Sequence, residues 1–352
     1  MIRAEIIADS ISKEGKRLTT FKLRYPRFIH AELMTHRMLS RNASSSRAVP
    51  VAKLLEEVRD DELRAQPIHW GMNQKGMQAA VENESLVPLR MVAFPEEGKT
   101  YHGDYGVVII PYHGGAITNV EVSIQDAWRE AAHRAADMAE AMDLAGYHKQ
   151  IVNRVLEPFT HINVVVSATE WDNFFGLRLH KDAQPEFQAL ARAMWQAMQE
   201  SIPEELQPGE WHLPFIETQD RKDARDYMES QGVDRSDDGA FWSLLCQVST
   251  ARCARVSFRS HETDKRSTVE EDLKLFHEKL FRPGQPLHAS PAEHQATPDE
   301  VLGLGGQMMV RGSHFDGVPW ANWNQHGNFI GWVQHRKTFQ GEAQAELPEE
   351  FR

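Results

Sequence analysis

Short apolar segments predict two strands in the first half of the chain. Residues 18–25 place Phe21, Leu23 and Tyr25 on one face, an alternation that is typical of a β-strand. The β-branched run at residues 162–166 predicts a second strand. These runs are far shorter than the roughly 20 apolar residues that a membrane-spanning helix needs, so we expect no membrane segment.

Helical periodicity is clearest beyond residue 123. Apolar residues recur every three or four positions from Ile124 to Met142, and Gly146 follows as a stop signal. A second long helix is expected from about Ala183. Shorter helices are expected over residues 27–39, ended by the serine-rich stretch 40–46, and after a capping box formed by Ser267 and Glu270. The first of these has four apolar residues at helical spacing, namely Ile29, Leu33, Met34 and Met38.

Two segments lack a clear period. Residues 60–120 have scattered glycine and proline and one β-like run, 105–112, which indicates an irregular insertion. Residues 201–240 contain three prolines and a charged run, which favours a linker or surface excursion.

Composition narrows the class of protein. The 352 residues include 39 Lys and Arg against 51 Asp and Glu, and 39 − 51 gives −12, which argues against a general nucleic-acid-binding surface. Cys246 and Cys253 are the two cysteines of the chain, so no disulfide framework is expected and a reducing cytoplasm is the natural compartment. The first sixteen residues have no long apolar core, so we expect no signal peptide.

Residues 35–47 have the composition of an anion-binding segment. These thirteen residues contain three arginines, one histidine, four serines and one asparagine, which are hydrogen-bond donors suited to phosphate oxygens. The alternative is a basic, polar loop on the surface.

The same segment resembles the signature of the flavin-dependent thymidylate synthases. That signature is Arg-His-Arg, a serine three residues later, Asn-Glu, a serine and Arg-Tyr, and the matching residues here are His36, Arg37, Ser40, Asn42, Ser45 and Arg47. The chain departs from it at Thr35, Ala43 and Ala48. Further family segments follow in the family's order at residues 153–158, 171–174, 178 and 183–186.

The family's opening elements stand at the other end of this chain. An Ala-Arg-Val-Ser-like segment lies at residues 254–258, and a His-x-Ser-Pro-x-Glu-His motif lies at residues 288–294. The chain therefore resembles a circularly permuted member of the family. A permutation of this kind requires Lys16 and the residues just after His294 to lie close together.

The resemblance implies an α+β fold with an antiparallel sheet and long packed helices in a single catalytic domain. Its parts would be the signature-bearing residues 1–200 with an insertion at about 51–120, a linker or insertion at 201–247, the permuted opening elements at 248–296 and a C-terminal extension at 297–352.

The resemblance also implies roles for individual residues. Arg178 would face the pyrimidine and stabilise negative charge on it, and Glu32 stands where the family usually has a base-contacting glutamine. The nucleotide 5′-phosphate would be held by Ser45, Ser46, Arg47 and Arg154. FAD would be contacted by His36, Arg37, Asn173, Ser257, His288, Ser290 and Glu293. Taken singly, an arginine such as Arg154 or Arg178 is more often a surface ion-pair residue, and an asparagine such as Asn173 is more often a helix cap or a polar group on a helix face.

The implied reaction is the reductive methylation of dUMP at C5. Methylenetetrahydrofolate would give the carbon and NADPH would reduce the FAD, with no metal and no protein nucleophile, in a homo-oligomer that in this family is a tetramer. Glu32 and Ala43 also motivate a hydroxymethylase acting on dUMP or dCMP. The changes at Thr35 and Ala43 motivate a non-catalytic nucleotide-binding protein.

Overall fold

A five-stranded sheet forms the centre of the protein in the computed structural model, which describes residues 1–76, 81–93, 116–257, 266–282, 287–302 and 317–342. The strand order is β3-β6-β2-β1-β7, and only the β1–β7 pair is parallel. The strands are β1 (Arg3–Ser12), β2 (Arg17–Pro26), β3 (Ser40–Ala43), β6 (His161–Ala168) and β7 (Glu204–Leu206). The two predicted strands and the α+β class are confirmed.

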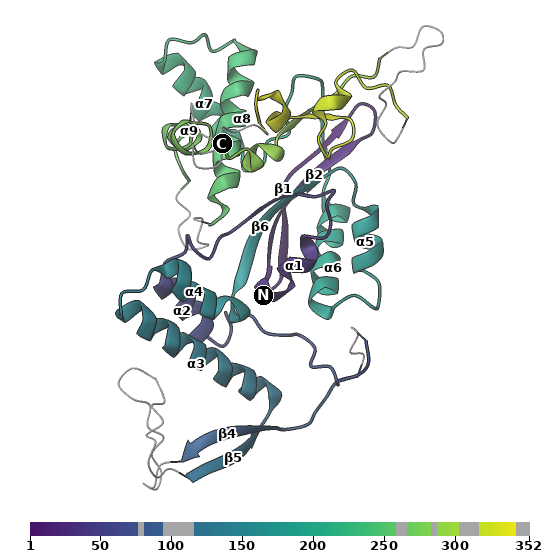
Figure 1. Ribbon diagram of the computed structural model, residues 1–352. Helices are drawn as coiled ribbons and strands as arrows, with labels where there is room; N and C mark the ends of the chain where they lie inside the picture. Colours follow the sequence, from purple (N-terminus) through teal and green to yellow (C-terminus); the bar gives the residue numbers. More distant parts are fainter. Residues whose placement is uncertain (77–80, 94–115, 258–265, 283–286, 303–316, 343–352) are drawn as a thin grey trace, which may run out of the picture.

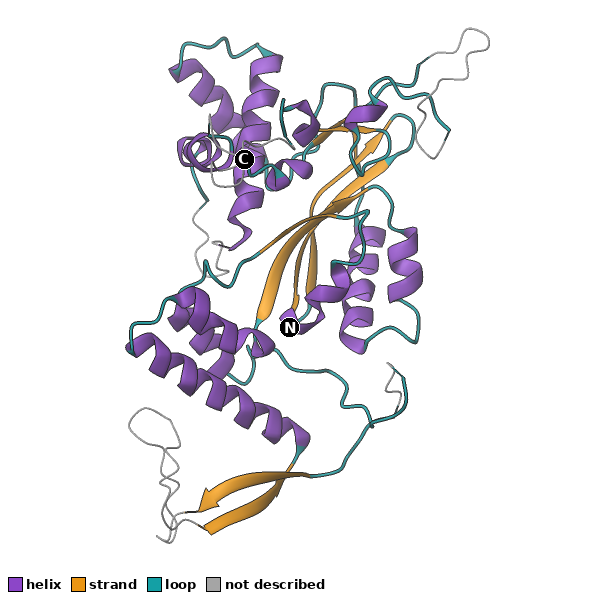
Figure 2. Cartoon of the chain, in the orientation of Figure 1, coloured by secondary structure: helices purple, strands orange, loops and turns teal. Residues whose placement is uncertain are grey.

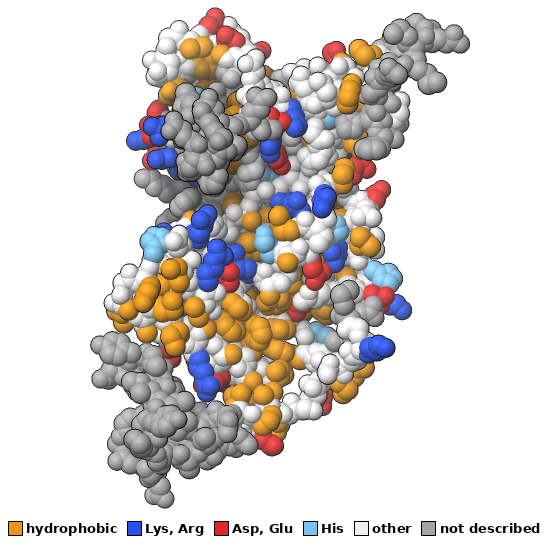
Figure 3. Space-filling model, viewed as in Figure 1, with side chains coloured by type: hydrophobic (Ala, Val, Ile, Leu, Met, Phe, Trp, Pro, Cys, Tyr) orange, Lys and Arg blue, Asp and Glu red, His pale blue; other side chains and the backbone are white. Residues whose placement is uncertain are grey.

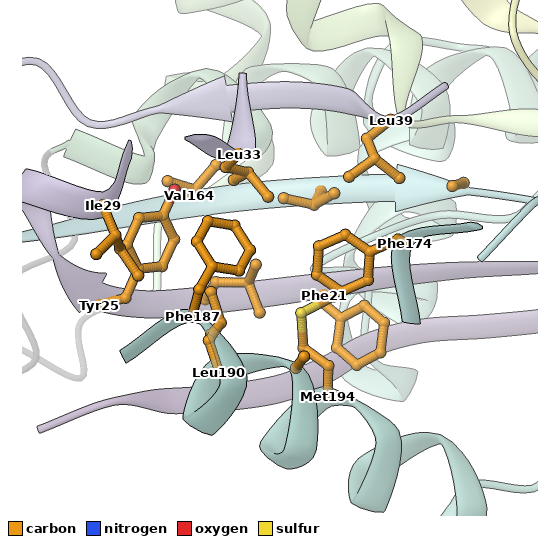
Figure 4. Close-up of a cluster of buried hydrophobic side chains, with 14 of the residues drawn as sticks. Phe21, Tyr25, Ile29, Leu33, Leu39, Val164, Phe174, Phe187, Leu190 and Met194 are labelled. Carbon is orange, nitrogen blue, oxygen red and sulfur yellow. The ribbon is translucent and has the colours of Figure 1, made fainter. Parts of the chain in front are cut away.

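Both faces of strand β6 are buried, which explains its continuous apolar sequence. Val164 and Val166 face one core cluster, whereas Val165 packs on the other face with Cys253 and Val256. The first cluster is covered by α5 (Asp172–Arg178) and α6 (Pro185–Glu200), seen beside the sheet in Figure 1. Figure 4 shows side chains of α6 directed at the strands, namely Phe187, Leu190 and Met194.

Three helices form a second cluster beyond one end of the sheet (Figure 2). They are α2 (Val51–Arg59), α3 (Ile124–Leu144) and α4 (Lys149–Leu156). Helix α3 begins where the sequence predicts, because the Ser123 side chain accepts a hydrogen bond from the Asp126 amide. Gly146 follows it with φ of 85°. Helix α2, with its buried Val51, Leu54, Leu55 and Val58, was not expected.

The segment 60–120 contains a regular hairpin next to α3, formed by β4 (Val87–Ala93) and β5 (Ala116–Val122). The β-like run at 105–112 lies outside the described residues.

Residues 201–247, expected as a linker or insertion, contain regular secondary structure. Strand β7 extends the main sheet, and α7 (Thr218–Ser230) packs against α8 (Asp238–Ala254). Helix α7 buries the stripe Asp220, Ala224 and Met228 at a spacing of four, which the surrounding charged residues conceal in the sequence. The division of the chain into a body, insertions and an extension stays a prediction.

The next helix, α9 (Val269–Leu275), has its capping box one residue later than predicted. Thr268 and Glu271 form it, and Ser267 instead donates hydrogen bonds to the Asp272 carboxylate. No helix among the described residues is both long enough and apolar enough to cross a membrane.

The short helix after Pro26 ends earlier than predicted. It comprises a 3₁₀ turn, Arg27–Ile29, and α1 (His30–Leu33), and Met34 and Met38 are exposed. The physical reason is Arg41, whose Nη1 donates to the carbonyl oxygens of Leu33, Met34 and His36 at 3.1, 3.0 and 3.0 Å. Arg41 thereby holds these carbonyls in a turn, and the serine-rich stretch that follows becomes strand β3.

The C-terminal part lies beside the start of β2. Strand β8 (Ala296–Pro298) pairs with β9 (Trp332–Gln334), and Leu18, Ala296 and Trp332 share one core cluster. Trp332 Nε1 donates to the Lys16 carbonyl at 3.2 Å. The proximity that the permutation requires is therefore present, which supports the permutation without establishing it.

A buried hydrogen-bonded chain crosses the sheet. Ser10 Oγ contacts His212 Nδ1 at 2.9 Å, and His212 Nε2 contacts Thr20 Oγ1 at 2.8 Å. Ser167 Oγ lies 2.5 Å from Thr20 Oγ1 and 2.8 Å from His294 Nδ1. Burial lowers the pKa of both histidines to about 3, so both rings are neutral in the folded protein.

These histidines predict a loss of stability in mild acid. In the unfolded chain His212 and His294 take up protons near pH 6.5, whereas in the folded chain they do so only near pH 3. Protonation of these two side chains therefore favours unfolding between these pH values. Between pH 8 and pH 5 the free energy of unfolding is expected to fall by about 4 kcal/mol for the pair. Urea unfolding followed by tryptophan fluorescence measures it. An unchanged free energy at pH 8 and pH 5 would contradict the assignment.

Candidate active site

Arg178, at the end of α5, brings together two residues from the segment after β2. Its Nη1 donates to Glu32 Oε2 at 2.7 Å, and its Nε donates to His36 Nε2 at 2.8 Å. Its guanidinium also lies over the Phe187 ring, 4.5 Å from the centroid. Three residues predicted for the pyrimidine and flavin therefore meet at one place.

His36 is neutral in this arrangement. Burial, then the charges of Arg178 and Arg41, lower the pKa of His36 to about 4. Its Nε2 can therefore accept the hydrogen bond from Arg178, which leaves the positive charge on the guanidinium. The result is a fixed cation at the rim of a cavity.

That cavity has a volume of about 430 Å³, and Arg178 is one of its lining residues. It is lined by Gly176, Leu177, Arg178, His180, Asp182 and Ala183. Cavities of this size accommodate molecules as large as a nucleotide. The arrangement can hold a planar ring beside a preorganised positive charge.

The predicted phosphate ligands lie in two neighbouring places, the turn between β3 and α2 and helix α4. Ser46 Oγ and Arg154 Nη1 both donate to Glu157 Oε1, at 2.6 and 2.8 Å, and Arg47 is exposed. Asn153 Nδ2 donates to the Ser46 carbonyl at 2.7 Å and holds this turn in place. In this structure Arg154 is thus an ion-pair residue, and a phosphate would compete with Glu157 for its donors.

The residues predicted for FAD lie in four places, namely the turn before β3, helix α5, residue 257 and residues 288–293. Arg37, Asn173, His288 and Ser290 are exposed, and Glu293 is half-buried. The 3₁₀ turn Ser290–Glu293 packs against β3, which brings the C-terminal motif to the signature segment. The Ser257 side chain lies outside the described residues.

This donor set fits an anionic dinucleotide. Exposed guanidinium, imidazole and hydroxyl groups can donate hydrogen bonds to the oxygens of a diphosphate. Figure 3 shows Lys and Arg side chains gathered across the middle of the molecule, between the upper and lower groups of helices.

Comparison with known proteins decides the family. The family model described as "thymidylate synthase complementing protein" matches residues 18–204, more than half of the chain. The chain belongs to this family. The resemblance of the signature segment is thereby confirmed, whereas the roles of its single residues stay predictions.

Solved structures similar to this member of the thymidylate synthase complementing family include two enzymes. A flavin dependent thymidylate synthase ThyX from Helicobacter pylori, complexed with FAD and dUMP, is 17% identical over 51% of this chain and 67% of that chain, with a TM-score of 0.29. A UMP/dUMP methylase PolB from Streptomyces cacaoi, bound with 5-Br UMP, is 18% identical over 57% and 89%, with a TM-score of 0.32. Both likenesses are weak, and no curated protein matches the chain.

Sequence reasoning missed several residues at the site of this family member. Arg41 stands inside the signature segment, and Glu157 stands beside Arg154, but neither has a spacing that reveals its partner. Three further residues contact the site from the segment 327–337, whose aromatic and basic sequence does not reveal their partners. Asn328 contacts Ser40 from 288 positions away, and Gln334 and Arg336 contact Glu293 from 41 and 43 positions away. Only the folded chain shows them.

Neither cysteine belongs to the site. Cys246 and Cys253 are both buried, and burial raises the pKa of the Cys246 thiol. A buried thiol of raised pKa, such as that of Cys246, is a poor nucleophile.

Proposed function

We propose that the protein is an FAD-dependent enzyme that methylates dUMP at C5, with methylenetetrahydrofolate as carbon donor and NADPH as reductant. The observation that carries this proposal is the convergence of Glu32 and His36 on Arg178, which is itself one of the residues that line the cavity. FAD, once reduced by NADPH, would supply the hydride that is delivered to the pyrimidine. The protein supplies binding, orientation and electrostatic stabilisation.

Arg178 is the proposed catalytic residue. Glu32 and His36 fix its guanidinium from two directions, and Phe187 supports it from below, so little reorganisation is needed when charge develops. A guanidinium donates hydrogen bonds and keeps its charge at any physiological pH. It is therefore suited to stabilise negative charge on a pyrimidine carbonyl oxygen.

Glu32 is the proposed specificity residue. An ionised carboxylate accepts hydrogen bonds and cannot donate them, and both uracil N3–H and the cytosine amino group are donors. Glu32 Oε2 lies 2.7 Å from Arg178 Nη1 in an ion pair. A dCMP substrate, or a hydroxymethylated product, is therefore the second candidate, and a non-catalytic nucleotide-binding homologue is the third.

Two variants at the proposed phosphate site are expected to change dUMP binding in opposite directions. Arg47→Ala is expected to weaken dUMP binding about tenfold and deoxyuridine binding by less than twofold, because Arg47 would contact the phosphate alone. Glu157→Gln is expected to tighten dUMP binding severalfold, because it removes a negative charge that competes for Ser46 and Arg154. Calorimetric titration measures both. Equal effects on nucleotide and nucleoside would contradict the phosphate site.

An oligomer is also proposed. Several large apolar side chains of α3, α4 and their connection are exposed, namely Met138 (48%), Leu144 (67%), Tyr147 (57%) and Ile151 (50%). Figure 3 shows hydrophobic surface over this part of the molecule. Apolar surface of this kind is typical of subunit contacts, and it supports the homo-oligomer that the family resemblance implies.

A flavin spectrum tests the enzyme proposal most simply. The purified protein, or the protein mixed with FAD and freed of excess, is expected to retain the flavin absorbance spectrum. A colourless protein that cannot be reconstituted would leave only the non-catalytic reading.

A further inference from the structure

The segment 327–336 reaches the signature segment, although it lies far beyond the family match. Asn328 Nδ2 donates to the Met38 carbonyl at 2.8 Å, and Ser40 Oγ donates to Asn328 Oδ1 at 3.0 Å. Both hydrogen bonds fall within the turn and strand that follow His36 and Arg37. The family model ends at residue 204, so these contacts come from outside the part that defines the family.

The same segment also contacts the second predicted flavin motif, which is the His-x-Ser-Pro-x-Glu-His motif at residues 288–294. Gln334 Nε2 donates to the Glu293 carbonyl at 2.9 Å and to Asn328 Oδ1 at 3.1 Å. Arg336 Nη1 forms an ion pair with Glu293 Oε1, and Arg336 Nε pairs with Glu342. The predicted FAD residue Glu293 is therefore held by backbone and side chain alike.

The Gln334 side chain is tightly packed. Gly327 has φ of 63°, and a Cβ at this position would lie 2.5 Å from Gln334 Oε1. Gln334 itself is 2% exposed. The Gln334 side-chain amide is thus enclosed by the turn at Gly327 and by the two predicted flavin motifs. We expect this contact to be rigid.

We propose that Arg336 is a positioning residue of the FAD site, which acts by fixing the Glu293 carboxylate while Asn328 and Gln334 hold the two flavin motifs together. The inference rests on the proposed function, because Glu293 is assigned to FAD by that proposal. It adds that the C-terminal segment is part of the cofactor site. Among the described residues, the two motifs also meet through the packing of the Ser290–Glu293 turn on β3 and through the opposite charges of Arg41 and Glu293.

The test compares two neighbouring cations. Lys337 lies next to Arg336 and pairs with Glu342, as Arg336 does, but it has no ion pair with Glu293 among the described residues. Arg336→Ala is expected to weaken FAD binding about tenfold, and Lys337→Ala by less than twofold, in titrations of the apoprotein followed by flavin fluorescence. Arg336→Lys is expected to recover part of the loss, because the charge opposite Glu293 returns.

Two further measurements separate positioning from general stability. The melting temperatures of the ligand-free Arg336→Ala and Lys337→Ala proteins are expected to agree within a few degrees. In the Glu293→Gln background, Arg336→Ala is expected to have less than a threefold further effect on FAD binding, because the two residues act as one unit. Additive effects would overturn the positioning role.

The outcomes distinguish the two levels of proposal. Wild-type protein that binds no FAD would overturn the proposed function and this inference with it. Wild-type protein that binds FAD, with Arg336→Ala and Lys337→Ala having equal effects, would overturn this inference alone.

Discussion

Arg178→Ala is expected to lower kcat/KM for dUMP methylation by about 100- to 1000-fold, which is the usual cost of removing one preorganised charge-stabilising donor. The dissociation constant of dUMP is expected to change less, because the phosphate contacts at the other end of the site remain. Arg178→Lys is expected to recover little, since an ammonium cannot donate to Glu32 and His36 in the geometry of the guanidinium. Steady-state product formation measures kcat/KM of both variants, and calorimetric titration measures the dissociation constant of dUMP.

Arg192→Ala is the matched control for this experiment. Arg192 lies on α6 and donates to Gln188 at 2.9 Å on an exposed surface. It is expected to leave kcat/KM unchanged within twofold. An Arg178→Ala enzyme with activity similar to that of the control would contradict the catalytic role.

Arg252→Ala is expected to lower the free energy of unfolding by about 3–5 kcal/mol, because it breaks a buried ion pair and leaves charge behind. Arg252 Nε donates to Asp272 Oδ2 at 2.8 Å, and Nη2 lies 2.7 Å from Asp220 Oδ1. All three side chains are almost fully buried, and they join α7, α8 and α9. Urea unfolding measures the change.

Arg235→Ala serves as the control for stability. Arg235 pairs with Asp226 and Glu229 at 2.8 and 2.7 Å on an exposed surface. Exposed ion pairs contribute little, so its loss is expected to be within the error of the measurement. Similar losses for the two arginines would contradict the view that the buried network holds these helices together.

The central elements were predictable because local signals agree with the tertiary structure. Residues 18–25 alternate as a strand does, and Ser123 and Gly146 mark the ends of α3. The meeting of Glu32, His36 and Arg178 was predictable only through the family resemblance, because residues 142 and more positions apart in the chain have no local signal that joins them.

The remainder was concealed by interactions between distant residues. Arg41 ends the helix after Pro26 because it donates hydrogen bonds to carbonyl oxygens that would otherwise accept from the helix backbone. The helix propensities of residues 27–39 do not reveal this interaction. Helix α7 is highly charged, and its buried face depends on α8 and on the Arg252 network. The role of segment 327–336 depends wholly on contacts with residues far away in the chain.

The most direct test is the mass of the product formed from dUMP and from dCMP, side by side, with FAD, methylenetetrahydrofolate and NADPH present. The account predicts that dUMP gains one methyl group and that dCMP is unchanged. Conversion of dCMP, or a hydroxymethyl product from either nucleotide, would contradict the assigned reaction while keeping the flavin site. No product from either nucleotide, with the protein folded and FAD bound, would contradict catalysis on these pyrimidine nucleotides altogether.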